Sequence, residues 1–138
     1  MKKILIGAIL FSTSIFAYNL NIEVSKMKNY KGQILIALFD KSGSFPKPKV
    51  VLKKGTIAKI DNKKVFYTFK NVPKGVYAVS LVHDENSNEK MDTNFIGMPK
   101  EGYGASNNPK NRFSPPTFKQ AKFNFTKTTD IKIFIDYL

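Results

Sequence analysis

The chain has 138 residues, a net charge of +13, 42% hydrophobic residues and no cysteine. This length and composition favour one globular domain and exclude a disordered tail. Without cysteine, the chain can form no disulfide, thiolate metal site or cysteine nucleophile, and it cannot carry the lipid anchor of a lipoprotein.

The first residues have the three parts of a secretory signal peptide. Met1–Lys3 is positively charged, Ile4–Phe11 is almost wholly apolar, and Ile15–Ala17 resembles the end of a cleavable signal. An uncleaved membrane anchor is the alternative, but the apolar run is short for a bilayer. We predict a signal peptide over residues 1–17, a single soluble domain over 18–138 with no transmembrane segment, and a periplasmic or secreted location.

Alternation with a period of two dominates the rest of the chain, and a helical period is nearly absent. The stretches 34–39 and 75–83 are apolar on both faces, as expected for strands covered on both sides. Many short strands without helices indicate a sandwich or a small barrel. Six strands are predicted over residues 19–25, 34–39, 64–70, 75–83, 121–125 and 131–137, and weaker ones over 49–52 and 56–60.

Residues 84–116 interrupt this pattern with 33 residues that contain no convincing strand or helix. Irregular loops longer than about 15 residues are uncommon in compact domains and are usually functional or disordered. The loop is rich in glycine and proline and has few large apolar side chains. It therefore needs another source of order, or it is mobile.

The start of this loop has the spacing of a calcium-binding loop. Oxygen-bearing side chains recur at Asp84, Asn86, Asn88 and Asp92, and the backbone carbonyl of Lys90 would supply a fifth ligand. The sixth loop position is Glu89 rather than glycine, and the twelfth is Phe95 rather than glutamate, so any calcium affinity should be weak. A simple turn closed by Asp and Asn side chains is the alternative interpretation.

His83 is the only histidine and the one candidate for an alternative function as a hydrolase. Adjacent strand residues point to opposite faces, so His83 and Asp84 should not pair directly. We assign no catalytic residue and expect His83 to pack at the rim of the core.

Further candidates for ligand binding form a polar set in the later part of the loop: Tyr103, Asn107, Asn108 and Arg112.

Removal of Lys2 and Lys3 with the signal peptide lowers the net charge from +13 to +11. Such an excess favours anionic envelope surfaces, including lipid head groups and lipopolysaccharide, as a second alternative function. Export argues against nucleic acid as a partner. Solubility in an organism with lysine-rich proteins would explain the same charge.

Several long motifs resemble a bacterial domain-of-unknown-function family, number 2141. The motifs are Gly32–Asp40, Asn71–Val79, His83–Asn88 and Met91–Asn108, with Phe118, Ala121 and Phe123. The resemblance implies a small exported protein with no assigned activity. It also implies glycines at positions 87 and 89, where this chain has Ser87 and Glu89.

The pattern from Asn71 to Val79 is also similar to the strand entry of transthyretin-like and carboxypeptidase-regulatory-like sandwiches. By this analogy we predict an all-β fold: an antiparallel, seven- to eight-stranded Greek-key β-sandwich of the transthyretin or immunoglobulin-like kind, with one long irregular loop. The predicted function is a non-enzymatic periplasmic binding or accessory module, and calcium is the one predicted cofactor.

Overall fold

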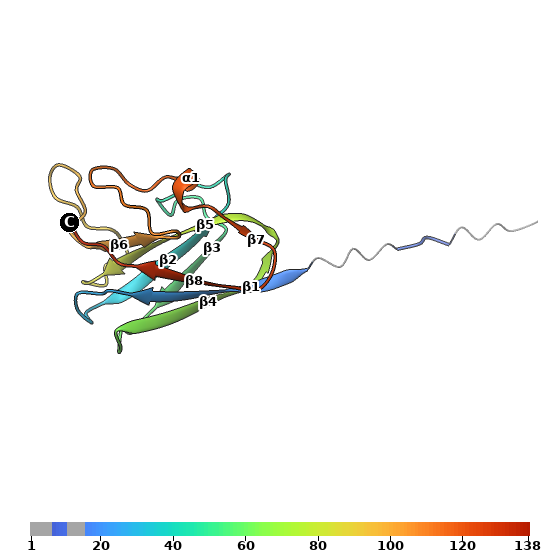
Figure 1. The fold of residues 1–138 in the computed structure, drawn as a ribbon, viewed down its shortest axis with the longest axis horizontal. Coiled ribbons are helices and arrows are strands. Elements are labelled where there is room, and N and C mark those ends of the chain that lie inside the picture. The colour runs from blue at the N-terminus through green and yellow to red at the C-terminus, as the bar shows by residue number, and fades with distance from the viewer. Residues whose placement is uncertain (1–6, 11–15) are drawn as a thin grey trace, which may run out of the picture.

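Eight strands and one short helix follow one another in the computed structural model, which describes residues 7–10 and 16–138 (Figure 1). The predicted signal peptide falls largely on residues 1–6 and 11–15, outside the described part. The elements are β1 (Ala17–Ser25), β2 (Gln33–Phe39), β3 (Lys53–Ile57), β4 (Lys64–Pro73), β5 (Gly75–Asp84), β6 (Gly102–Ala105), α1 (Phe118–Ala121), β7 (Phe123–Phe125) and β8 (Thr129–Phe134).

The strands form two sheets, which confirms the predicted all-β class. One sheet has the order β4-β1-β8, and the other has the order β3-β2-β5-β6, with β7 paired to β5. The prediction that every pair is antiparallel is wrong, because β8 runs parallel to β1, with Ile22 opposite Ile131 and Val24 opposite Ile133. Alternation shows which face of a strand is buried but carries no information on the direction of its neighbour.

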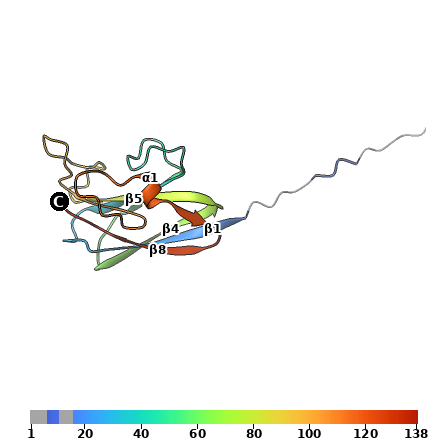
Figure 2. The same ribbon diagram turned by 45° about the horizontal axis from the view of Figure 1, so that its top comes forward.

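Buried side chains of both sheets meet in one core. Leu20, Ile22 and Val24 of β1 are almost fully buried and belong to the same cluster as apolar residues of β2, β4, β5 and β8. The second face of β5 is covered as well, since Ala78 packs with Ala105 and with Ala121 of α1. Figure 2 shows α1 lying over β5. Residues 75–83 are therefore apolar on both faces because both faces of β5 are covered, as predicted.

Several predicted boundaries are wrong. The third strand is Lys53–Ile57 rather than 49–52 and 56–60, and the last regular strand ends at Phe134 rather than at residue 137. The long irregular region also contains a strand, β6. Its glycines carry no strand signal, but they are required by packing: a Cβ on Gly102 would lie 2.4 Å from the Tyr137 ring, and one on Gly104 would lie 2.8 Å from Ile133.

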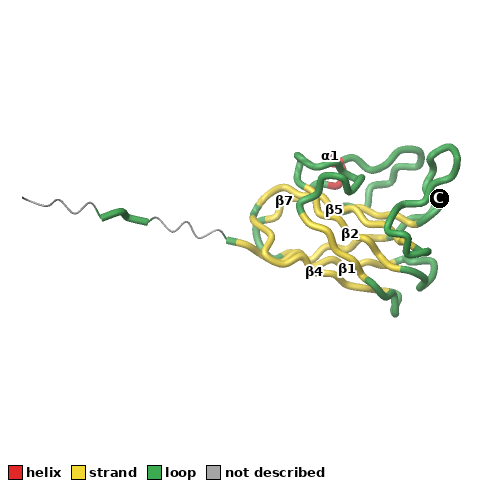
Figure 3. The backbone as a smooth tube through the Cα atoms, turned by 180° about the vertical axis from the view of Figure 1, so that it is seen from behind, coloured by secondary structure: helices red, strands yellow, loops and turns green. Residues whose placement is uncertain are grey.

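Strand ends of both sheets gather at one end of the molecule, near the C-terminus (Figure 3). Ser25, the last residue of β1, lies opposite Lys64 and Phe134, and Gln33 lies opposite Asp84. We call this the loop end and define it as residues 26–32, 58–63, 84–101 and 135–138. The candidate residues of the long loop begin here.

Candidate functional site

Asp84 closes the base of the 84–101 loop. It is fully buried at the end of β5. Its carboxylate accepts hydrogen bonds from Gln33 Nε2 (2.8 Å) and from the backbone N–H groups of Asn88 (3.1 Å) and Glu89 (2.8 Å). All three donors are neutral, so the buried carboxylate is stabilised by amide groups rather than by a cation.

The structure brings Asn86, Asn88 and Asp92 together, as the spacing predicts. The Asp92 carboxylate accepts hydrogen bonds from Asn86 Nδ2 (2.6 Å) and Asn88 Nδ2 (2.8 Å). These two bonds, that from Asn88 first, lower the pKa of Asp92 because they favour its charged form. The amide oxygens of Asn86 and Asn88 accept the N–H groups of Asn88 (3.3 Å) and Lys90 (3.2 Å).

The sharp turn of the loop forms although it lacks glycine. Ser87 and Glu89 have φ angles of 55° and 64°, the left-handed region that favours glycine. Glu89 occupies the sixth position of the calcium-type spacing, where this conformation is needed. Glu89 in place of glycine therefore does not change the shape of the turn, but it makes the turn energetically more costly to form.

Glu101 is a member of this cluster that sequence reasoning missed. It is only 5% exposed, and its carboxylate accepts the backbone N–H groups of Glu85 and Asp92, both at 3.1 Å. Burial raises the pKa of Glu101, and the negative charges of Asp92 and Asp84 raise it further. A single glutamate between Lys100 and Gly102 gave no periodic signal that could have singled it out.

The loop is acidic within a basic protein. Residues 84–101 contain five of the ten acidic residues and two lysines, a local charge of −3 in a chain of +13. The three ion pairs of the described residues involve Glu23, Glu85 and Asp136, and none involves Asp84, Asp92 or Glu101. In residues 7–10 and 16–138, no three His, Asp or Glu side chains converge as a ready metal site.

The oxygen donors nevertheless suit a hard cation. Calcium takes carboxylate, amide and carbonyl oxygens in flexible geometry. In the structure, the amide nitrogens of Asn86 and Asn88 face Asp92, and their oxygens accept backbone N–H groups of the loop. These are the hydrogen bonds of the alternative interpretation, a turn closed by Asp and Asn side chains.

His83 holds three segments together. The ring is buried, with Nε2 lying 2.8 Å from the Lys31 carbonyl and Nδ1 lying 2.6 Å from the Tyr137 hydroxyl. A carbonyl can only accept, so Nε2 donates to it. In the neutral ring Nδ1 then accepts from the Tyr137 hydroxyl, whose oxygen accepts the Lys28 N–H (3.1 Å). Both ring nitrogens are occupied, which favours a structural role over the hydrolase alternative.

Of the later polar candidates, Tyr103 and Asn108 line one small pocket, which Asn107 and Arg112 do not line. Asn107 Nδ2 donates to the Gln120 and Lys122 carbonyls, and Asn108 is bonded to Lys132 and Phe134 of β8. These amides fix the loop to its neighbours. The backbone of Tyr103 is paired with Asp136 through two hydrogen bonds, whereas Arg112 is exposed.

An open groove of about 570 Å³ lies at the loop end, and sequence reasoning did not identify it. Four lysines line it: Lys26, Lys28, Lys63 and Lys64. Lys28 and Lys64 pair with Glu85 (3.4 Å) and Glu23 (3.3 Å). The groove can attract an anion.

One comparison with known proteins gave a match. A family model described as "Uncharacterized protein conserved in bacteria (DUF2141)" matches residues 22–132. No curated protein and no solved structure shows significant similarity to the chain. Among the described residues, no helix has the length and apolar character needed to cross a membrane.

Proposed function

Because the chain belongs to the uncharacterised bacterial family DUF2141, whose description names no activity, we propose that it is an exported, non-enzymatic binding module whose 84–101 loop binds calcium. Export is supported by the signal-like sequence of residues 1–17. For the fold, we propose that the two sheets form a Greek-key sandwich of the transthyretin or immunoglobulin-like kind, and their shared core supports this.

The carrying observation is a set of carboxylates held only by neutral amides. Asp84, Asp92 and Glu101 accept seven hydrogen bonds from backbone N–H groups and from Gln and Asn side chains. Burial raises the pKa of Glu101, and the nearby negative charges of Asp92 and Asp84 raise it further because like charges repel. A divalent cation would neutralise them.

The ligands would come from both ends of the loop. Asp84, Asn86, Asn88 and Asp92 supply side-chain oxygens at its start, the Lys90 carbonyl supplies a backbone oxygen, and Glu101 supplies a carboxylate where the chain enters β6. Bound calcium would cross-link these ends and hold the intervening chain. Weak extracellular calcium modules have dissociation constants of about 10⁻⁴–10⁻³ M.

Thermal unfolding of the chain from Tyr18 onward tests this proposal. Calcium at about one hundred times its dissociation constant should stabilise the protein by about 2.7 kcal/mol relative to chelator at matched ionic strength. Asp92→Asn should abolish this response. The matched control is Asp61→Asn, a charge-neutralising change at an exposed carboxylate outside the loop, which should retain it. Equal melting temperatures in calcium and chelator would overturn the proposal.

A further inference from the structure

The tip of the 84–101 loop presents two apolar side chains to solvent. Phe95 is 99% exposed and Ile96 is 69% exposed. The turn beneath them is closed: Asn94 N–H donates to the Met98 carbonyl (2.9 Å), and Asn94 Oδ1 accepts the N–H groups of Ile96 and Met98 (both 3.0 Å). A hydrogen-bonded turn therefore holds both side chains outward.

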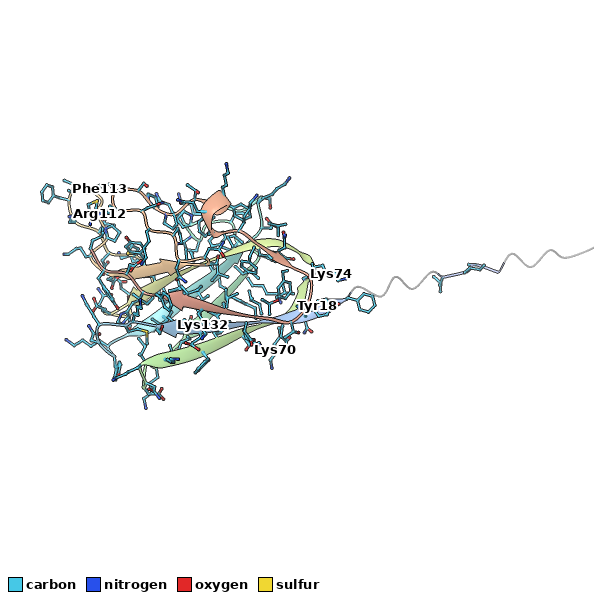
Figure 4. The ribbon with its side chains drawn as sticks, in the orientation of Figure 1. Tyr18, Lys70, Lys74, Arg112, Phe113 and Lys132 are labelled. Carbon is cyan, nitrogen blue, oxygen red and sulfur yellow. The ribbon has the colours of Figure 1, made fainter. Side chains whose placement is uncertain are left out.

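A second loop presents Phe113, which is 86% exposed, next to the exposed Arg112. This loop runs along β8 toward the loop end, since Asn108 bonds to Phe134 and Lys110 pairs with Asp136 (3.4 Å). Figure 4 shows Arg112 and Phe113 near that end, away from Lys70 and Lys74. Two separate loop tips at one end of the molecule thus expose large apolar groups.

The lysine groove lies at this same end, because Lys64 is opposite Ser25 at the end of β1. Lys26 and Lys63 form no ion pair within the described residues. The loop end also carries acidic groups. Asp84 and Glu101 are buried, and Glu85 and Asp136 are paired with Lys28 and Lys110. Asp61, Glu89 and Asp92 form no ion pair among the residues that the structure describes, so any attraction to an anionic surface must come from the basic side chains that outreach them.

We propose that the loop end docks on an anionic phospholipid bilayer. Phe95, Ile96 and Phe113 enter the boundary between head groups and acyl chains, while Lys26, Lys63 and Arg112 contact lipid phosphates. Apolar groups combined with basic residues are the features by which peripheral proteins hold an anionic membrane. This inference goes beyond cation binding and does not depend on it.

The shape of the surface favours a bilayer over a protein partner. A stable protein interface needs a continuous patch of about 800 Å² on each side. Phe95 and Phe113 instead stand on separate convex tips, which a fluid bilayer can surround one by one. Long cationic side chains beside them can extend to the phosphates.

Flotation with phosphatidylcholine vesicles, with and without phosphatidylglycerol, tests the inference on the chain from Tyr18 onward. All samples contain chelator, so a failure of the calcium proposal cannot produce a failure here. We expect binding only to the anionic vesicles. The double variant Phe95→Ser/Ile96→Ser and the single variant Phe113→Ser should each weaken partitioning at least tenfold. The apolar control is Phe66→Ser, an exposed phenylalanine on β4, which should bind as the wild type does.

A second pair of variants tests the charge. Lys26→Gln/Lys63→Gln should weaken binding at least fivefold, whereas Lys70→Gln/Lys74→Gln removes the same charge away from the loop end and should have a smaller effect (Figure 4). Absence of wild-type binding to anionic vesicles would overturn the inference. So would equal binding by the Phe95/Ile96 variant, or tip-dependent self-association in sedimentation without vesicle binding.

Discussion

Two glycines provide a direct test of how tightly the loop end is packed. Gly32 and Gly97 both have left-handed backbone, with φ of 66° and 83°. A Cβ on Gly32 would lie 1.9 Å from the backbone carbonyl oxygen of Asp84, whereas a Cβ on Gly97 would meet nothing within 4 Å. Alanine at Gly97 therefore carries only the conformational cost, and alanine at Gly32 carries that cost plus a clash.

The magnitudes follow from these distances. Left-handed backbone costs a non-glycine residue about 1–2 kcal/mol, which is the expected loss for Gly97→Ala. In Gly32→Ala, the Asp84 backbone must also move and weaken the bond between Gln33 and the Asp84 carboxylate. A hydrogen bond to a charged group is worth about 1.5–3 kcal/mol, so Gly32→Ala should cost about 2.5–5 kcal/mol.

Urea unfolding of the two variants, monitored by circular dichroism in chelator, measures the difference. The midpoint of Gly32→Ala should fall well below that of Gly97→Ala at an unchanged slope. Equal losses of stability in the two variants would refute the close approach of residue 32 to β5. They would also remove the basis for regarding Asp84 as rigidly positioned.

Two further predictions concern the same end of the molecule. Tyr137→Phe removes the hydroxyl between the Lys28 N–H and His83 Nδ1 and should cost about 1–3 kcal/mol in urea unfolding. The exposed Tyr30→Phe should cost almost nothing, and equal effects would contradict the hydrogen bonds of the Tyr137 hydroxyl. Glu101 has a raised pKa, so its stabilising contribution is complete below pH 4.5 and is lost as pH rises through its folded value. The free energy of unfolding of Glu101→Gln relative to wild type should therefore increase from pH 4 to pH 7 in paired urea titrations, and a constant or falling difference would show that the carboxyl is not perturbed as described.

Alternation is sufficient to identify the strands that bury one face. Leu20, Ile22 and Val24 are buried because period two places them on the core side of β1. It is not sufficient for β6, where Gly102 and Gly104 are required by side chains that come from the C-terminal segment. That requirement exists only after distant parts of the chain have met, so no local pattern can contain it.

In the candidate site, too, local spacing predicts some features, and others depend on distant parts of the chain. The spacing of Asn86, Asn88 and Asp92 predicts that they lie close together, because alternate residues of a tight loop face inward. It does not predict which amide atom faces Asp92, since an Asn side chain both donates and accepts. Glu101 joins the cluster only because β6 pairs with β5, with Gly102 opposite His83. Its position depends on a register between strands rather than on its neighbours in sequence.

These contacts indicate what orders the long loop. Fixing a residue's backbone costs about 1–2 kcal/mol, and burial of apolar side chains is the usual compensation. Here the largest apolar side chains of the tip, Phe95 and Ile96, point into solvent and offset none of that cost. Hydrogen bonds to Asp84, Asp92 and Glu101 compensate for the ordering of the loop instead of apolar burial. The order of the loop therefore depends on the hydrogen bonds that these three carboxyl groups accept, and a cation bound among them would also stabilise the turn that holds Phe95 and Ile96 outward.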